Sequence, residues 1–473
     1  MLKFTAKDDV DLVRLILKKA ELKELGEIYG SPLNILLPHR MDENIKEFAA
    51  VLDKYQLSGK IHFAHKCNKS TALVRRAKLN GIKIDVASAE ELKHALINGF
   101  RGEEIEVTGP KNPELMRLGL MQGVTFNVDN LEELNQLERL ALMLKLAEPV
   151  KILLRLSNFN NPRKQVIPKP SRFGVPVEQF TKFLDEIPKL TKLELIGLSF
   201  HLDTTALEEK LVAVEQCLKL FEKCYETGLY PRVLDIGGGF PINYLTSKEE
   251  WDDSLSEIRE QIMANTPPTW DGGKFGLRAE HGKLVGKLST ANYYSKEAKA
   301  ENLETLLEAS LPDFGDRKVA EILRENEIEL WLEPGKALLD NVGLTLARIN
   351  FVKDGPKAER LVGIDMNRSN FVMDRQETLI DPILLSDEME NSANYFIIGN
   401  LCMENDLIFN RTINLTKTPK AGDWLLFPNT AAYSMDFSES ETIMHPVAKK
   451  IILDKNLKMV GSDEAYNPYR EAL

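Results

Sequence analysis

The chain has 473 residues, 43% of them hydrophobic and 28% charged, which is typical of a globular protein with room for two domains and a large core. Its net charge of −11 argues against binding to nucleic acid or anionic membrane surfaces, because both depend on basic patches. Acidic residues appear by position 8, so the N-terminus does not resemble a secretory signal. No apolar run approaches the ~20 residues that span a bilayer.

The four cysteines, Cys67, Cys217, Cys224 and Cys402, lack the C-x-x-C spacing typical of metal sites. A disulfide framework built from four cysteines would also be sparse for a chain of this length. We therefore expect a cytoplasmic protein without a metal site.

From residue 61 onward, short β-branched runs alternate with amphipathic helical stretches such as 89–98, 131–145 and 206–227. This alternation is typical of parallel βαβ units. Eight runs, the number that closes a (β/α)8 barrel, are predicted as strands: Ile61–Ala64, Ile82–Ala87, Ile105–Thr108, Thr125–Val128, Ile152–Leu156, Ile196–Phe200, Val233–Ile236 and Ile328–Leu332.

Polar and glycine residues gather at the ends of these runs. Barrel enzymes carry their chemistry at the C-terminal ends of the strands, so this placement supports the barrel more strongly than any one strand assignment. The residues concerned are Lys66, Asp85, Thr108, Arg155, His201, Gly237, Gly238, Gly239 and Glu333.

After about residue 340 long helices disappear, and alternating segments predict an antiparallel β domain of sandwich or barrel type: Thr345–Val352, Leu361–Ile364, Trp424–Phe427 and Val447–Leu453. Residues 32–37 could lend it a strand. We therefore expect residues 1–40 to contribute to the β domain, 41–340 to form the barrel, and 341–473 to form the C-terminal domain. A charged insertion at about 241–327 follows the seventh strand and could cover the site.

Three motifs indicate a phosphorylated aldehyde cofactor. Lys66 follows the first buried strand, where partial burial would lower its pKa and free the amine to form a Schiff base. Gly237, Gly238 and Gly239 follow the seventh strand and can turn backbone N–H groups toward a phosphate. Glu333 ends the eighth run, where a carboxylate could keep a pyridine nitrogen protonated, and Lys336 could reach the phosphate. Each motif alone is more often an ordinary strand end or turn.

Taken together, the motifs resemble those of the ornithine/diaminopimelate/arginine decarboxylase family, the fold-type III pyridoxal 5′-phosphate (PLP) enzymes. The Lys66 motif is similar to the family's A-V-K-A-N box, and residues 85–92 are similar to its D-V-A-S-x-x-E-L segment. Ser171–Gly174 resembles S-K-F-G, and the glycine run and the Glu333 motif recur in the same order. The resemblance implies an alanine-racemase-like barrel with a C-terminal β domain.

The resemblance also implies roles for matching positions. His201 would stack on the cofactor ring, Asp85 would lie behind it, and Arg155 near its edge. Thr204, Gly335, Lys336 and Tyr433 would help to bind the cofactor.

A further residue implied by the resemblance is Cys402. It would enter the partner subunit's site and protonate the product, so the protein would be at least a homodimer.

Several positions depart from the family pattern. Asp203 replaces a glycine, Thr204 stands for a serine, and Lys336 replaces an arginine and loses its bidentate fork. Met403 stands where the family usually has an acid that holds the substrate's distal group. Because methionine cannot pair with an ammonium, plain ornithine or lysine is not the expected substrate.

Glu404 and Asp365 are tentative compensating substrate residues. We hypothesise a less common amino acid or an amino-acid derivative that contacts the insertion.

Two alternatives remain beside a decarboxylase. One is a PLP-dependent amino-acid racemase or epimerase, but racemases of this fold commonly set an arginine, not a carboxylate such as Glu333, against the pyridine nitrogen. The other is a non-catalytic PLP-binding homologue, which retention of Lys66, His201 and Cys402 disfavours.

Overall fold

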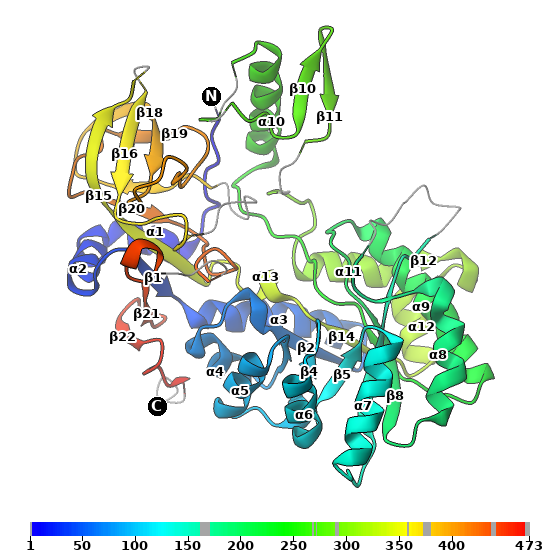
Figure 1. Ribbon diagram of the computed structural model, residues 1–473. Coiled ribbons are helices and arrows are strands. Elements are labelled where there is room, and N and C mark those ends of the chain that lie inside the picture. The colour runs from blue at the N-terminus through cyan, green and yellow to red at the C-terminus, as the bar shows by residue number, and fades with distance from the viewer. Residues whose placement is uncertain are drawn as a thin grey trace. The chain divides into compact units, whose positions relative to one another are not determined.

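The computed structural model describes residues 2–160, 171–266, 269–270, 272–288, 293–356, 359–371, 380–436 and 441–468 (Figure 1). The chain divides into two compact units. The β unit comprises Met1–Met41, Ile242–Lys296 and Leu339–Tyr466. The barrel unit comprises Asp42–Pro241 and Glu297–Leu338, together with the C-terminal end from Asn467.

The barrel unit is a closed ring of eight parallel strands, as predicted. In spatial order the strands run β5-β4-β3-β2-β14-β9-β8-β6, and pairing of β5 with β6 closes the ring. Every one of the eight predicted runs coincides with one of these strands: β2 (Gly59–Ala64), β3 (Lys83–Val86), β4 (Ile105–Val107), β5 (Thr125–Val128), β6 (Val150–Ser157), β8 (Leu193–Phe200), β9 (Val233–Asp235) and β14 (Glu329–Leu332). The fold class is therefore confirmed.

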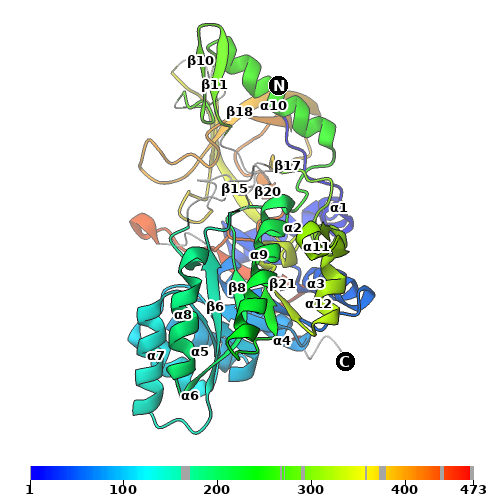
Figure 2. The same ribbon diagram turned by 90° about the vertical axis from the view of Figure 1, so that its right-hand side faces the viewer.

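Helices of this unit surround the strands (Figures 1 and 2). Several begin at a side-chain cap just after a strand: Ser88, Asn112 and Asn130 accept backbone N–H groups at the starts of α5, α6 and α7. The helices are α3 (Pro38–Lys54), α4 (Thr71–Leu79), α5 (Ala89–Ile97), α6 (Pro113–Gln122), α7 (Leu131–Met143), α8 (Phe180–Glu186), α9 (Leu207–Glu226), α11 (Ala300–Glu308), α12 (Val319–Glu325) and α13 (Gly335–Leu338).

The β unit is built on a curled sheet whose pairings are mostly antiparallel, although β1 with β21 and β16 with β18 pair in parallel. β1 lies between β15 and β21, so a strand from the N-terminal region sits inside a sheet made largely by the last third of the chain. Its strands are β1 (Leu33–Leu36), β15 (Gly343–Asp354), β16 (Arg360–Ile364), β17 (Ile383–Leu385), β18 (Glu390–Ile398), β19 (Ile413–Lys417), β20 (Trp424–Phe427), β21 (Lys449–Leu453) and β22 (Met459–Ser462).

Helices α1 (Val10–Leu17) and α2 (Lys19–Tyr29) precede β1 in this unit. Buried residues of both helices, Leu15 and Leu22, pack into one apolar cluster with Ile35 of β1 and Trp424 of β20. A second cluster fills the other part of the sheet and includes Val362, Ile397 and Phe427. Burial of these apolar side chains holds the sheet together.

The segment expected as one insertion after the seventh strand divides between the units. Residues 242–296, with α10 (Lys248–Met263) and the hairpin β10 (Leu277–Glu280) and β11 (Lys283–Gly286), belong to the β unit. The following helices α11 and α12 belong to the barrel unit and complete the connection from β9 to β14. Part of the expected insertion is therefore an ordinary barrel crossover.

No helix among the described residues is both long and apolar enough to cross a membrane.

Candidate active site

A small, partly open cavity lies at the C-terminal ends of the barrel strands. Four of its lining residues, Lys66, Arg155, His201 and Glu333, were predicted as site residues from the sequence. Asn127 and Phe200 also line it, and neither was predicted; each ends a barrel strand, which is the signal that could have identified it.

Lys66 extends from a short 3₁₀ turn (His65–Cys67) directly after β2. Its Nζ lies 3.3 Å from Oδ2 of Asp85, whose other oxygen accepts a hydrogen bond of 2.5 Å from the Thr108 hydroxyl. Burial disfavours the ammonium, but the carboxylates of Asp85 and Glu333 outweigh burial and raise the pKa of Lys66 above its ordinary value. The expectation that burial lowers the pKa of Lys66 is wrong for the chain without its cofactor, because the carboxylates of Asp85 and Glu333 lie close to Nζ and stabilise the ammonium.

His201 follows β8 and contacts both the glycine run and Glu333. The backbone N–H of Gly238 donates to its Nδ1 at 3.2 Å. Burial and the positive charges of Lys66 and Arg155 lower the pKa of His201, in agreement with that hydrogen bond.

Glu333 is buried at the end of β14, with its Oε2 3.7 Å from Nδ1 of His201. Burial alone would raise the pKa of Glu333, but His201, Lys66 and Arg155 outweigh burial and hold it at about 2. The residue therefore presents a permanent negative charge to the cavity.

The three glycines after β9 are required by close packing. A Cβ on Gly237 would lie 2.7 Å from the carbonyl oxygen of Phe200, and one on Gly238 would lie 2.6 Å from that of Glu333. Gly237 and Gly239 also have φ of +63° and +74°, a region that L side chains rarely adopt. The turn can pack against these carbonyl groups only because its three residues carry no side chain.

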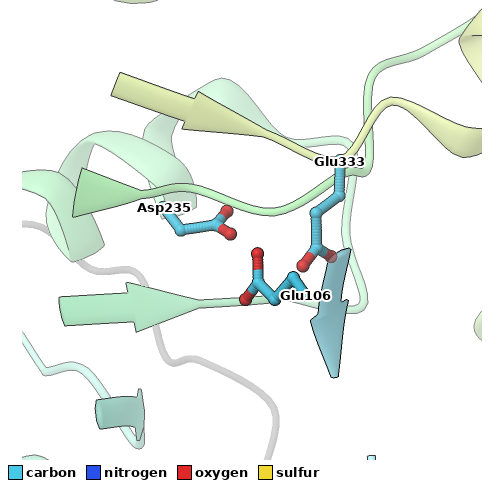
Figure 3. Close-up of side chains that lie close together, drawn as sticks. All are labelled: Glu106, Asp235 and Glu333. Atoms are coloured by element: carbon cyan, nitrogen blue, oxygen red, sulfur yellow. The ribbon is translucent and has the colours of Figure 1, made fainter. Parts of the chain in front are cut away.

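Three buried carboxyl groups face one another inside the barrel: Glu106 of β4, Asp235 of β9 and Glu333 (Figure 3). One oxygen of each lies within 4.8 Å of the others. Asn127 donates a hydrogen bond of 2.9 Å to Glu106, and the Gly237 N–H donates one of 2.7 Å to Asp235. Burial and the neighbouring negative charges raise the pKa of both Glu106 and Asp235 well above ordinary values, in the opposite direction to the pKa of Glu333.

Sequence reasoning missed Glu106 and Asp235 as parts of the site. A single acid inside a short strand resembles the solvent-facing position of an alternating pattern. His62 of β2 is a further buried neighbour, with its Nε2 3.8 Å from Glu106; burial is the main cause that lowers its pKa to about 3.

Four further residues of the barrel unit were predicted to bind the cofactor. Arg155, Thr204 and Lys336 are half-buried, and Gly335 is buried. Arg155 lies over the Phe173 ring, 5.1 Å from its centroid, and Thr204 accepts a hydrogen bond from the N–H of Ala206. Gly335 and Lys336 begin α13, where a Cβ on Gly335 would lie only 2.1 Å from Sγ of Cys67.

Five predicted site residues lie in the β unit, and their part in the site stays a prediction. Cys402, Met403 and Glu404 are exposed on one loop, and Tyr433 is half-buried with φ of +63°. Asp365 accepts a hydrogen bond of 2.9 Å from Asn400.

The barrel residues fit pyridoxal phosphate. They offer an amine that can bind the aldehyde, a turn of three glycines that brings bare backbone close to the site, and a buried carboxylate with a lowered pKa that suits a pyridinium nitrogen. Lys66 and Glu333 line one cavity, and the glycine turn contacts His201, which lines it too.

Residues 40–286, more than half of the chain, match the family model described as "Pyridoxal-dependent decarboxylase, pyridoxal binding domain". The chain belongs to this family of pyridoxal-dependent decarboxylases. Its cofactor is PLP, and the predicted activity, PLP-dependent decarboxylation of an amino acid or an amino-acid-derived substrate, is confirmed at the level of the family.

Individual relatives agree with this assignment. The chain is 30% identical to "Uncharacterized protein y4yA" of Sinorhizobium fredii, covering 89% of this chain and 87% of that protein. It is 22% identical to diaminopimelate decarboxylase of Archaeoglobus fulgidus, covering 96% and 95%. The crystal structure of diaminopimelate decarboxylase from M. jannaschii with L-lysine matches the fold with a TM-score of 0.72 at 18% identity, covering 95% of each chain.

Proposed function

We propose that this chain is a cytoplasmic, homodimeric decarboxylase in which Lys66 holds the cofactor and the substrate is neither plain ornithine nor plain lysine. The observation that carries the proposal is the convergence of Lys66, His201 and Glu333 on one cavity at the barrel rim. The four cysteines form no disulfide among the described residues, which agrees with a reducing compartment.

Each barrel residue has a defined task. PLP, when bound, supplies an electron sink for the electron pair that remains when the carboxylate leaves as CO₂. Glu333 stays ionised and keeps the pyridine nitrogen protonated. His201, half-buried and with a pKa below its ordinary value, offers an uncharged face to the ring. Asp85 pairs with the Lys66 ammonium and holds that side chain at the cavity until the aldehyde is present.

Proton return and substrate choice are assigned to the β unit. Cys402 carries an exposed thiol on the loop that also holds Met403, and we assign it the protonation of the product carbon in the partner subunit. Met403 offers no charge to a distal ammonium, whereas Glu404 follows it directly and Asp365 accepts a hydrogen bond from Asn400. A substrate with an apolar or blocked distal end satisfies this loop better than a free diamine.

A second candidate is diaminopimelate, because named decarboxylases of that substrate match nearly the full chain. Its distal end carries both an amine and a carboxylate, so it presents a negative charge that ornithine and lysine lack.

The test is a substrate panel with purified PLP-loaded protein. Ornithine, lysine, diaminopimelate and Nω-acylated amino acids are supplied separately, and CO₂ release is measured beside deuterium exchange at Cα. We expect CO₂ release from diaminopimelate or an acylated amino acid, and a loss of at least ~10³-fold in Lys66→Ala because covalent activation disappears.

Two results would contradict the proposal. Brisk turnover of ornithine or lysine would remove the substrate assignment, and Cα exchange without CO₂ release would indicate a racemase. Borohydride reduction followed by peptide mapping provides the control, since it should mark Lys66 and no other lysine.

A further inference from the structure

Lys210 is a buried lysine that the chemistry described above does not use. It lies in the first turns of α9 and is only 1% exposed. Its Nζ has no hydrogen-bond partner among the described residues. The ammonium instead lies over the ring of Phe240, 3.8 Å from the ring centroid, and Phe240 directly follows the glycine run.

Lys111 in the same unit shows what a satisfied buried lysine looks like. Its side chain is fully buried, and Nζ donates to the carbonyl oxygens of Gly109 and Asn127 at 2.8 and 2.7 Å. It also pairs with Glu133 at 2.9 Å. Burying a charge is unfavourable unless such partners are present, so Lys210 lacks an anion that Lys111 has.

The electrostatics of Lys210 agree with a missing anion. Burial lowers its pKa to about 7, and no carboxylate in the part of the chain that the structure describes counteracts that effect. A dianionic group beside it would restore the charged form at neutral pH.

The position of Lys210 indicates which anion is missing. Its Cε lies 3.7 Å from the place that a Cβ on Gly239 would take, and the carbonyl oxygen of Thr204 lies 2.6 Å from the same place. The glycine turn, the segment at Thr204 and the start of α9, a helix of 20 residues, therefore meet at this lysine. Glycine turns and helix N-termini both favour a bound phosphate.

We propose that Lys210 is a further cofactor-binding residue, whose ammonium lies behind Gly237–Gly239 and attracts the phosphate of PLP. This inference rests on the proposed function. It supplies a cation in addition to Lys336, which lacks the bidentate fork of an arginine.

The test compares PLP with pyridoxal, which has the aldehyde and the ring but no phosphate. Affinities of both for the wild type, Lys210→Met and Lys223→Met are measured by the absorbance change on binding. Lys223 is the matched control because it is exposed on the same helix. We expect Lys210→Met to weaken PLP binding roughly tenfold, because a buried positive charge that attracts the phosphate through the low-dielectric interior is removed, with pyridoxal affinity changed by less than about twofold.

The conservative variant Lys210→Arg should keep most of the preference for PLP over pyridoxal, whereas a lysine that only fills space would show no such rescue. Lys210→Gln gives the same comparison should the methionine variant not fold, and thermal melting checks folding in each case.

An unchanged ratio of PLP to pyridoxal affinity in folded Lys210→Met or Lys210→Gln would overturn the inference alone. A wild-type protein that binds neither compound would instead overturn the proposed function.

Discussion

At the scale of single residues, the barrel interior sets the charge of each acid by its surroundings. Lys66, His201 and Arg155 lower the pKa of Glu333 despite its burial, whereas burial beside other carboxylates raises the pKa of Glu106 and Asp235. Three acids with one oxygen each within 4.8 Å of the others therefore have pKa values shifted in opposite directions. Glu333, the acid whose pKa is lowered, lines the cavity.

Replacing Glu106 with glutamine should change how stability depends on pH. Folding raises the pKa of Glu106 above 4.5, its ordinary value in the unfolded chain. Below pH 4.5 the group is protonated in both states, and its contribution to stability is fully present. As the pH rises from there toward the pKa of the folded state, that contribution is lost. Each such proton makes the free energy of unfolding fall by about 1.4 kcal/mol per pH unit over this range. In Glu106→Gln we expect the fall between pH 5 and pH 8 to be shallower by about that slope.

Urea unfolding of the cofactor-free protein across this range measures the effect. Glutamine keeps an oxygen for the hydrogen bond from Asn127, so packing is preserved. Glu148→Gln is the control because Glu148 is exposed. Identical pH slopes for Glu106→Gln and wild type would show that Glu106 is not protonated in the native protein.

At the scale of elements, the site depends on turns at the ends of strands. β9 ends in three glycines, β2 ends in the 3₁₀ turn of Lys66, and β14 ends at Glu333. The N–H of Glu333 donates to the carbonyl oxygen of Gly237 at 3.0 Å, which joins two of these turns directly. The turns therefore hold one another in place, and a change in one should be felt at the others.

Gly237→Ala should weaken cofactor binding through this coupling. The new Cβ would lie 2.7 Å from the Phe200 carbonyl oxygen and 2.8 Å from Nδ1 of His201, so the turn or the imidazole must move. We expect a loss of PLP affinity of at least about tenfold, together with destabilisation of about 1–3 kcal/mol from overpacking.

Gly81→Ala separates the clash from backbone strain. Gly81 has a similar φ of +69°, but nothing lies within 4 Å of its added Cβ. This variant should lose about 1–2 kcal/mol of stability from the left-handed backbone and retain wild-type PLP affinity, as measured by absorbance titration. Equal PLP affinity in the two variants would show that the glycine turn does not form the cofactor site.

At the scale of the whole molecule, the predicted residues fall into two units that alternate along the chain. Lys66, His201 and Glu333 lie in the barrel unit, and Cys402 lies in the β unit. The proposed homodimer places Cys402 of one subunit in the site of the other. Each complete site then requires residues from two chains.

Mixing two inactive variants tests that arrangement. Lys66→Ala and Cys402→Ala should each lose at least ~10²-fold in kcat, the scale of lost acid–base or covalent chemistry. After subunit exchange of an equal mixture, about a quarter of sites should be complete, because half of randomly paired dimers are mixed and each has one intact site.

A mixture of Lys66→Ala with Glu333→Gln is the matched control. Both changes lie in the barrel unit, so every site in the mixed dimer carries one of them and no activity should return. If activity returned in neither mixture, or if analytical ultracentrifugation gave a monomeric mass, the proposed dimer with shared active sites would be contradicted.

The sequence by itself determined the barrel and much of its rim. Eight β-branched runs marked the eight strands, because strands buried on both faces need continuous apolar segments, and Lys66, His201 and Glu333 were predicted from their places at strand ends. Only the tertiary structure placed Glu106 of β4 against Asp235 of β9, since closure of the sheet joins residues more than 100 positions apart. It also placed Lys210 of α9 behind Gly239, through packing of the helix against the glycine turn. A local pattern cannot show whether an acid or a lysine faces water or the barrel interior, and that difference in burial decides its charge.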